Sequence, residues 1–275
     1  MKPKITKWIT RGFILFCVLI YAFPLYWMVI SSIKTMRGIY GDVSLFPSLS
    51  EITLATYYRA VEVGFFRYML NSFLIAIGTM LITLVLAVLA SYAISRLEAK
   101  WVKWTLIIFL LAQMLPPVLL ATPIYMMFDT VNLTNTYIAL ILANTFLTLP
   151  ISVIILRPVM NQIPRVMEEA AIIDGATFLQ TIYCIILPVV KPGLVVVGTI
   201  SFLMSYGEFL FALTLINESI RYPVTMGIYT LTSGTYAHEW NAAMAYSTLA
   251  TIPVLILFLL FQKYIVSGLT RGSVR

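Results

Sequence analysis

The sequence predicts an all-α, polytopic membrane protein with six transmembrane helices and both termini in the cytoplasm. Composition is the first reason. Of the 275 residues, 61% are hydrophobic and 11% are charged, whereas soluble domains have roughly 45–50% and 25%. The second reason is a set of long apolar runs, each at least the ~20 residues that a helix needs to cross a bilayer. The third is the position of the basic residues at the ends of these runs, which sets the topology.

The expected spans lie at about residues 12–33, 71–95, 104–128, 137–156, 193–216 and 242–262. Only the fifth contains a charged residue, Glu208. The first run follows four basic residues and could be a signal peptide. However, its apolar core is longer than the roughly 7–15 residues of such peptides, and no small-residue cleavage site follows it. We therefore expect a membrane anchor and one transmembrane domain over residues 1–275.

The orientation follows from the basic residues. With the N-terminus inside, 13 of the 18 Lys and Arg residues fall on the cytoplasmic side, as the positive-inside rule predicts. The five that lie outside are Lys34, Arg37, Arg59, Arg67 and Arg221. This bias explains the net charge of +7 without a nucleic-acid partner, because the basic residues form no single patch. Cys17 and Cys184 fall in separate parts of this topology, so no disulfide or metal framework is expected.

The third span is rich in proline, with Pro116, Pro117 and Pro123. Two adjacent prolines remove two backbone donors and clash with the preceding turn, so the helix must kink or break there. Irregular backbone at membrane depth persists only when it is buried in protein or faces a water-filled cavity. The sequence therefore predicts a cavity near Pro116 and Pro117.

The cytoplasmic segment 157–191 predicts two short helices joined at a glycine. Pro164 suits a helix start, and Gly175 can end that helix in a left-handed conformation. Thr177 and Gln180 form a capping-box pattern that starts the second helix. Pro188, with Pro192 and Gly193, then marks the return into the fifth span.

The first of these helices combines acidic and apolar residues. An apolar stripe is expected from Val166, Ala170 and Ile173, with Ala171 keeping the surface flat. A helix that lies on lipid favours Lys and Arg on its polar face, whereas this one has Glu168, Glu169 and Asp174. Acidic charge would be repelled by an anionic leaflet. The sequence therefore predicts that a protein partner docks here.

Polar residues recur at helical spacing in the fourth and fifth spans. They are Asn144, Thr148 and Ser152 in the fourth, and Ser201, Ser205 and Glu208 in the fifth. Two interpretations are compatible: hydrogen bonding between helices, or lining of a polar pathway. Glu208 is the ionisable residue inside a span, and intramembrane acids are rare and usually functional. A structural hydrogen bond to a neighbouring helix is the alternative.

The segment from Glu169 also carries a specific spacing: Glu-Ala-Ala, three residues, Gly, nine residues, then Ile-x-Leu-Pro. It resembles the cytoplasmic coupling loop of the permease subunits of ABC-type importers. The segments Asp174-Gly175-Ala176 and Lys191-Pro192-Gly193 are similar to the carbohydrate-importer branch, the maltose-type permeases. The likeness spans nearly the whole chain. The residues that it assigns to ATPase coupling are Glu168, Glu169, Ala170, Ala171, Asp174, Gly175, Ile185, Leu187 and Pro188.

This resemblance implies the membrane subunit of a heteromeric importer in a bacterial or archaeal cytoplasmic membrane. Its partners would be a sister permease, two ATPase subunits and an extracytoplasmic solute-binding protein. ATP and Mg²⁺ would be used by the ATPase, and this chain would bind neither a cofactor nor a metal. Glu169 would pair with a basic residue of the ATPase, and the solute would be a carbohydrate. The candidate pathway residues are Asn144, Thr148, Ser205, Tyr206, Glu208 and Phe209.

Three other functions can be compared with the residues of this chain. An ion-coupled secondary transporter would use Glu208 as its proton carrier but would give the charged cytoplasmic segment no purpose. An ABC permease for a non-sugar solute, such as a glycerol-phosphate-type compound, is also compatible. An intramembrane enzyme has little support, because Ser31-x-x-Lys34 lacks the rest of its acyl-enzyme signature. No Gly-x-x-x-x-Gly-Lys-Ser/Thr loop occurs, so this chain does not hydrolyse ATP by that route.

Overall fold

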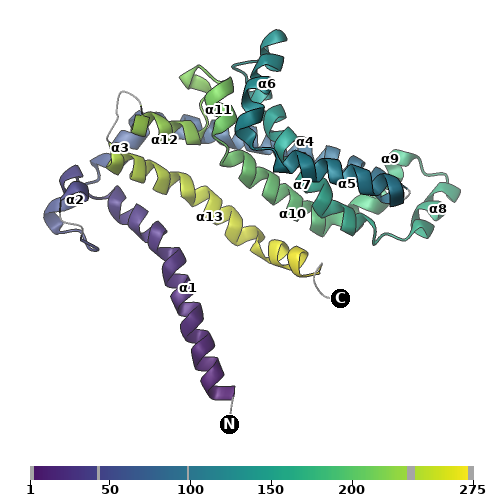
Figure 1. Cartoon of the computed structure of the whole chain (residues 1–275), viewed down its shortest axis with the longest axis horizontal. Helices are drawn as coiled ribbons and strands as arrows, with labels where there is room; N and C mark the ends of the chain where they lie inside the picture. Colours follow the sequence, from purple (N-terminus) through teal and green to yellow (C-terminus); the bar gives the residue numbers. More distant parts are fainter. Residues whose placement is uncertain (1–2, 42–43, 98, 234–238, 272–275) are drawn as a thin grey trace. The chain divides into compact units, whose positions relative to one another are not determined.

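A computed structural model describes residues 3–41, 44–97, 99–233 and 239–271 (Figure 1). In this part of the chain the regular structure is helical, and extended pairing is limited to one bridge between Lys34 and Ile52. The helices are α1 (Pro3–Ser32), α2 (Met36–Tyr40), α3 (Ala55–Glu62), α4 (Phe65–Arg96), α5 (Ala99–Met114), α6 (Pro117–Thr130), α7 (Tyr137–Met160), α8 (Arg165–Ile173), α9 (Phe178–Gln180), α10 (Leu187–Tyr206), α11 (Leu210–Leu215), α12 (Val224–Ser233) and α13 (Trp240–Arg271). The predicted all-α class is confirmed.

Among the described residues, five helical stretches are long and apolar enough to cross a membrane. They are Lys7–Ser32, Phe65–Arg96, Tyr137–Met160, Phe178–Tyr206 and Trp240–Lys263. Helices α5 and α6 make a sixth span if the pair is counted as one, but they are bent by 96° relative to each other. Pro116 precedes α6 and Pro117 is its first residue. The predicted break is therefore confirmed, because neither proline can donate the bond that would continue α5.

The fifth span differs from its expected position at both ends. The helix is continuous from Phe178 to Tyr206, through α9, a π-helical turn at Thr181–Ile186 and α10. The expected second short helix is therefore not separate from the membrane helix. A π turn changes the local hydrogen-bond register, which gives a reason why Pro188, directly after Leu187, does not end the helix. At the other end the helix stops at Tyr206, and α11 resumes after a break of three residues.

The chain forms two compact units. The first contains residues 1–66 and 227–253, and the second contains residues 67–226 and 254–275. In the first unit, Arg59 of α3 pairs with Glu239, just before α13, at 3.1 Å. The fully buried ring of Tyr246 lies edge-on to Phe65, with 5.0 Å between ring centroids.

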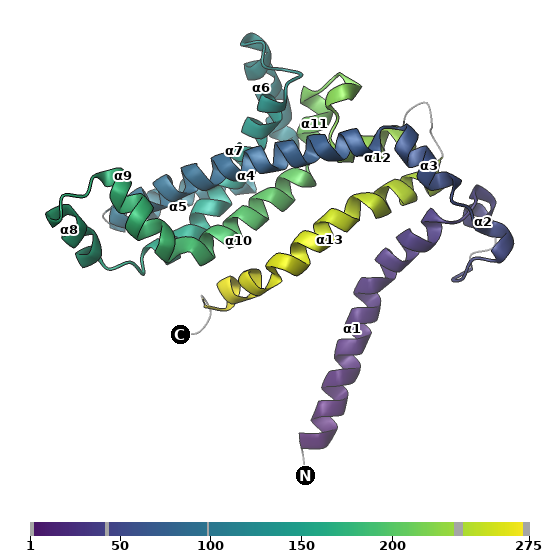
Figure 2. The ribbon, with the colours of Figure 1, turned by 180° about the vertical axis from the view of Figure 1, so that it is seen from behind.

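The second unit holds the regions singled out by the sequence. Its helices α4, α7 and α10 run side by side (Figure 2) and share one apolar core. Members of this core include Ala87, Val88, Val153, Leu156, Val190 and Val197. A second core joins α6 and α11 to the first half of α7, and includes Ala121, Leu140, Phe211 and Leu215. Gly193 permits a close helix contact, because an added Cβ would lie 3.1 Å from the Leu156 side chain.

Candidate coupling and transport site

Helix α8 is bounded by the residues that the sequence marks as its limits. It begins directly after Pro164 and ends at Ile173. Gly175 has a φ of 83°, in the left-handed region that favours glycine. The amides of Gly175 and Ala176 donate to the carbonyls of Ile172 and Ala171, at 3.0 and 2.9 Å. The predicted glycine stop and the capping box of Thr177 and Gln180 are both present.

A Gly175→Ala substitution is expected to lower solute uptake about fivefold or more. Alanine in the left-handed conformation costs about 1–2 kcal/mol, and 1 kcal/mol corresponds to about a fivefold change in an equilibrium. No atom lies within 4 Å of a Cβ added here, so the effect is on the backbone alone. Gly12→Ala in α1 is the matched control, since its added Cβ also meets nothing within 4 Å. Equal uptake rates in the two variants would contradict a structural requirement for this turn.

One face of α8 is open to solvent. Val166 and Ile173 are 70% and 84% exposed, and Glu169 and Ala170 lie between them on the same face and are exposed too. Asp174, at the end of the helix, is also exposed. The surface is therefore apolar with two carboxylates. Ala171 differs from the expectation: it is buried and points away from this face.

Glu168 also differs from the expectation that it is presented to a partner. It is buried, and its carboxylate forms an ion pair with the guanidinium of Arg96, at the end of α4. Arg96 Nε donates to Glu168 Oε2 at 3.3 Å, and Tyr92 Oη donates to the same oxygen at 2.9 Å. Successive residues of a helix lie about 100° apart around its axis, and here Glu168 faces α4 while Glu169 is exposed. Glu168 attaches α8 to α4.

The last turn of α4 also contacts the segment that follows α8. The ring of Phe178 lies edge-on to Tyr92 at 5.7 Å, and the Arg96 guanidinium lies over the Tyr92 ring at 5.4 Å. We call Tyr92, Arg96, Glu168 and Phe178 the α4–α8 anchor. Arg96 is one of the 13 basic residues on the cytoplasmic side of the predicted topology, and no sequence pattern marks Tyr92. Nothing local in the sequence connects them to Glu168, which lies more than 70 residues away.

The Ile-x-Leu-Pro end of the sequence pattern lies on the fifth membrane-spanning helix, Phe178–Tyr206. Ile185 is half-buried in the π turn, and Leu187, half-buried, packs against the core shared by α4, α7 and α10. Pro188 is exposed on the first turn of α10. These three residues therefore connect the coupling segment to α10, while the open face of α8 is formed by other residues.

The candidate pathway residues Asn144, Thr148 and Ser205 are buried and bond to neighbouring helices. Asn144 Nδ2 donates to Ser205 Oγ at 2.9 Å, and Ser205 Oγ donates to Thr79 Oγ1 at 3.1 Å. The hydroxyls of Thr83 and Thr148 are 2.8 Å apart. The structure thus shows the hydrogen bonding between α4, α7 and α10 that the polar spacing predicted. A pathway role for these residues stays a prediction.

Glu208 lies in the break between α10 and α11, and its side chain caps the start of α11. Its Oε1 accepts from the amide of Phe211 at 2.7 Å, and its Oε2 accepts from the amide of Ala212 at 3.2 Å. The first amides of a helix have no partner within it, so an acidic side chain at this place stabilises the helix start. Thr225 Oγ1 donates to the Glu208 carbonyl at 2.7 Å, which fixes the break further.

A Glu208→Ala substitution is expected to destabilise the protein by about 1 kcal/mol, the typical effect of losing a helix cap. It should lower the thermal midpoint of the purified protein, and with it the solute-stimulated ATPase activity of the complex. Glu208→Gln keeps one acceptor oxygen and should retain part of the stability. If Glu208 contacted the solute instead, Glu208→Ala would leave the thermal midpoint unchanged and shift the solute dose response.

The two aromatic candidates are packed inside the second unit. Tyr206 is buried, stacks on Phe202 at 5.9 Å and lies edge-on to Phe73 at 5.7 Å. Phe209 is half-buried and packs against the core of α6, α7 and α11. Tyr206 is therefore enclosed by these rings, whereas part of Phe209 stays exposed. Their roles in the pathway stay predictions.

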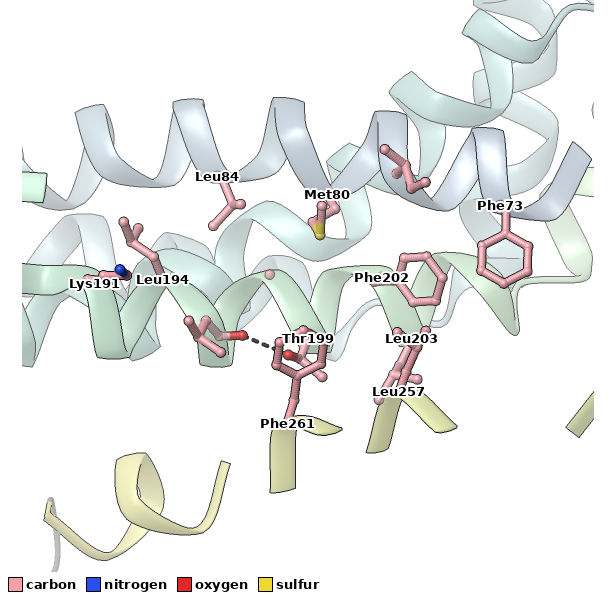
Figure 3. Close-up of a pocket in the computed structure, with 13 residues that line it drawn as sticks. Phe73, Met80, Leu84, Lys191, Leu194, Thr199, Phe202, Leu203, Leu257 and Phe261 are labelled. Carbon is pink, nitrogen blue, oxygen red and sulfur yellow. Dashed lines mark hydrogen bonds between the residues drawn. The ribbon is translucent and has the colours of Figure 1, made fainter. Parts of the chain in front are cut away.

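A groove of about 440 Å³ lies between α4, α10 and the second half of α13 (Figure 3). Its walls are almost wholly apolar and include Phe73, Met80, Leu84, Phe202, Leu257 and Phe261. Thr199 lines it too, but its hydroxyl already donates to the carbonyl of Val195 at 2.7 Å. The walls suit a helix or acyl chains, and not a polar solute. The sequence does not predict this groove, because positions that face lipid have the same apolar composition.

Known proteins match this chain over most of its length. Residues 84–271 match the family described as "Binding-protein-dependent transport system inner membrane component". The sulfoquinovosyl glycerol permease SmoH of Agrobacterium fabrum is 32% identical over 92% of this chain and 88% of its own. The trehalose/maltose permease MalG of Thermococcus litoralis is 35% identical over 94% and 92%. The diacetylchitobiose permease DasC of Streptomyces coelicolor is 31% identical over 92% and 91%.

Solved structures share the fold. A chain of a bacterial ABC transporter involved in alginate import superimposes with a TM-score of 0.77 and 18% identity. The match covers 95% of this chain and 96% of that one. A second alginate transporter structure, in complex with an alginate pentasaccharide-bound periplasmic protein, gives a TM-score of 0.63 at 17% identity.

Proposed function

The chain belongs to the family of binding-protein-dependent transport system inner membrane components, and we propose that its solute is a carbohydrate or a polyol-like compound. It is the permease subunit of an ABC importer, a multi-pass protein of the cytoplasmic membrane and a transport component rather than an enzyme. The relatives above are named for sulfoquinovosyl glycerol, trehalose or maltose, and diacetylchitobiose. These compounds all contain a sugar ring, which supports the carbohydrate proposal.

The chain works with the other components of an ABC importer. The finer composition that we propose is a heterodimer with a sister permease, two ATPase subunits and an extracytoplasmic solute-binding protein. The ATPase subunits would bind ATP and Mg²⁺, and this chain would contact lipid and no nucleic acid. The dependence on a binding protein in the family's own description supports the last of these partners.

The observation that carries the coupling role is the division of α8 into two faces. The outer face, with Val166, Glu169, Ala170 and Ile173, is exposed. The inner face attaches to α4 through Glu168 and Arg96. An amphipathic helix of this kind docks in a groove of a partner through its apolar residues. Glu169 would then pair with a basic residue in the ATPase, while Gly175 permits the turn.

Movement of the ATPase subunits would reach the membrane through the α4–α8 anchor. Because Arg96 belongs to α4, and α4 shares a core with α7 and α10, a pull on α8 acts on three packed helices together. Packed helices move as rigid bodies rather than deforming continuously. ATP-driven closure would therefore switch the transport cavity from inward-facing to outward-facing.

A test of the solute class uses the complex of this chain with its co-purified partners in proteoliposomes. ATP hydrolysis and uptake are measured with a panel of disaccharides, oligosaccharides and polyols, and with glycerol 3-phosphate as a non-sugar solute. We expect stimulation by at least one glycoside. Stimulation by glycerol 3-phosphate alone would overturn the carbohydrate proposal while leaving the importer assignment intact.

A further inference from the structure

A polar pocket of about 500 Å³ lies at the end of the second unit, where α4 and α7 end and α5 and α8 begin. Three arginines line it: Arg96, Arg157 and Arg165. The described residues that line it include no carboxylate. Glu168 neutralises Arg96 by the ion pair described above. Arg157 and Arg165 are left to give the pocket a net positive charge.

Two groups at this pocket lack a partner among the described residues: one nitrogen of Arg157 has no hydrogen-bond acceptor, and the first turn of α8 has no side-chain cap. Arg157 is half-buried, and its Nε is a buried donor without a hydrogen-bond partner. A buried guanidinium donor without an acceptor is costly, and an anion beside the guanidinium would offset part of that cost through its charge. The start of α8 at Pro164 and Arg165 also has no side-chain cap. Its first amides and the positive end of the helix dipole therefore add to the attraction for an anion.

The residues beside the pocket are of the types that gather at the level of lipid headgroups. Val102 of α5 lines the pocket, and its neighbours Trp101 and Trp104 are 60% and 56% exposed. Lys100 and Lys103 of the same two turns are exposed as well. Tryptophan and lysine gather at the membrane–water interface, and basic pockets between helix ends on the cytoplasmic side bind anionic headgroups.

We propose that this pocket binds the phosphate group of an anionic phospholipid in the cytoplasmic leaflet. Arg157, which lines the pocket, would attract the phosphate through its guanidinium charge, and Arg165 would donate from the uncapped start of α8. Because the bound phosphate would contact the first turn of α8, the lipid would hold the coupling helix in place beside the α4–α8 anchor. This proposal depends on the proposed function in one respect, which is that α8 lies on the cytoplasmic side of the membrane.

The test measures lipid retention by the intact complex, which does not depend on transport. The complex is purified with this chain in wild-type form or with Arg157→Gln, Arg165→Gln or both. Native mass spectrometry then follows titration with phosphatidylglycerol, phosphatidylcholine or inorganic phosphate. Arg221→Gln is the matched control, because Arg221 pairs with Glu218 in an i,i+3 turn on another segment. Arg157→Lys keeps the charge without the guanidinium fork.

We expect wild type to retain phosphatidylglycerol in preference to phosphatidylcholine. Each Arg→Gln change in the pocket should weaken retention about fivefold, the effect of one basic residue near an anionic headgroup. Arg221→Gln should have no effect, and Arg157→Lys should weaken retention less than Arg157→Gln does. Equal retention by all variants would overturn the proposal. Competition by inorganic phosphate at concentrations similar to those of the lipid would also overturn it, because the ligand would then be a soluble anion.

Discussion

Glu169→Lys is expected to abolish solute uptake while the chain still inserts into the membrane. The side chain is exposed on the outer face of α8, so its replacement leaves the ion pair of Glu168 and Arg96 intact. If Glu169 pairs with a basic residue of the ATPase, a lysine there places two like charges in an interface. Such contacts cost several kcal/mol, and roughly 2.7 kcal/mol already lowers binding a hundredfold.

The measurement compares uptake of labelled solute, the amount of chain in the membrane fraction and the ATPase that co-purifies. Glu218→Lys is the matched control, since Glu218 is also exposed but lies in a different segment. We expect the control to transport normally and Glu169→Lys to lose both uptake and the bound ATPase. Normal uptake in Glu169→Lys would show that α8 does not couple through this carboxylate.

Glu168→Ala is expected to separate ATPase binding from transport. Its carboxylate is 10% exposed and the Arg96 side chain is 19% exposed, so removing one partner leaves a charge in a poorly solvated place. Breaking a buried ion pair costs about 3–5 kcal/mol. The outer face of α8 is unchanged in this variant. We therefore expect the ATPase to remain bound while its hydrolysis no longer responds to solute.

A charge exchange, Arg96→Glu with Glu168→Arg, tests whether the pair itself matters. Each single reversal should be at least as harmful as Glu168→Ala, because two like charges would then meet. The double variant should regain part of the solute-stimulated hydrolysis, and the coupling energy follows from the double-mutant cycle. Solute-stimulated ATP hydrolysis at the wild-type level in Glu168→Ala would show that movement of α8 is not transmitted to α4 through this ion pair.

The sequence predicted the features that depend on local chemistry. Apolar runs identified the membrane helices because their length and lack of charge leave few other structures. The break at Pro116 and Pro117 followed from missing backbone donors, and the end of α8 at Gly175 followed from its left-handed turn. Each of these depends on residues that are neighbours in the chain.

The features that the sequence did not predict depend on contacts between distant segments. A list of acidic residues in α8 cannot show that Glu168 turns inward, because only the position of Arg96 on α4 decides which face is buried. Glu208 was expected inside a continuous span, but the helix stops before it and its carboxylate caps α11. For the same reason the spacing of Asn144 predicted hydrogen bonds between helices without identifying Ser205 as its partner.

The coupling of α8 to a separate ATPase is tested by purifying the tagged chain from its native membrane in mild detergent and identifying every protein that accompanies it. We predict a stoichiometric ATPase and a second permease, with the ATPase lost in Glu169→Lys. Recovery of the chain alone or as a homo-oligomer, unaffected by Glu169→Lys, would show that α8 does not couple this permease to a separate ATPase.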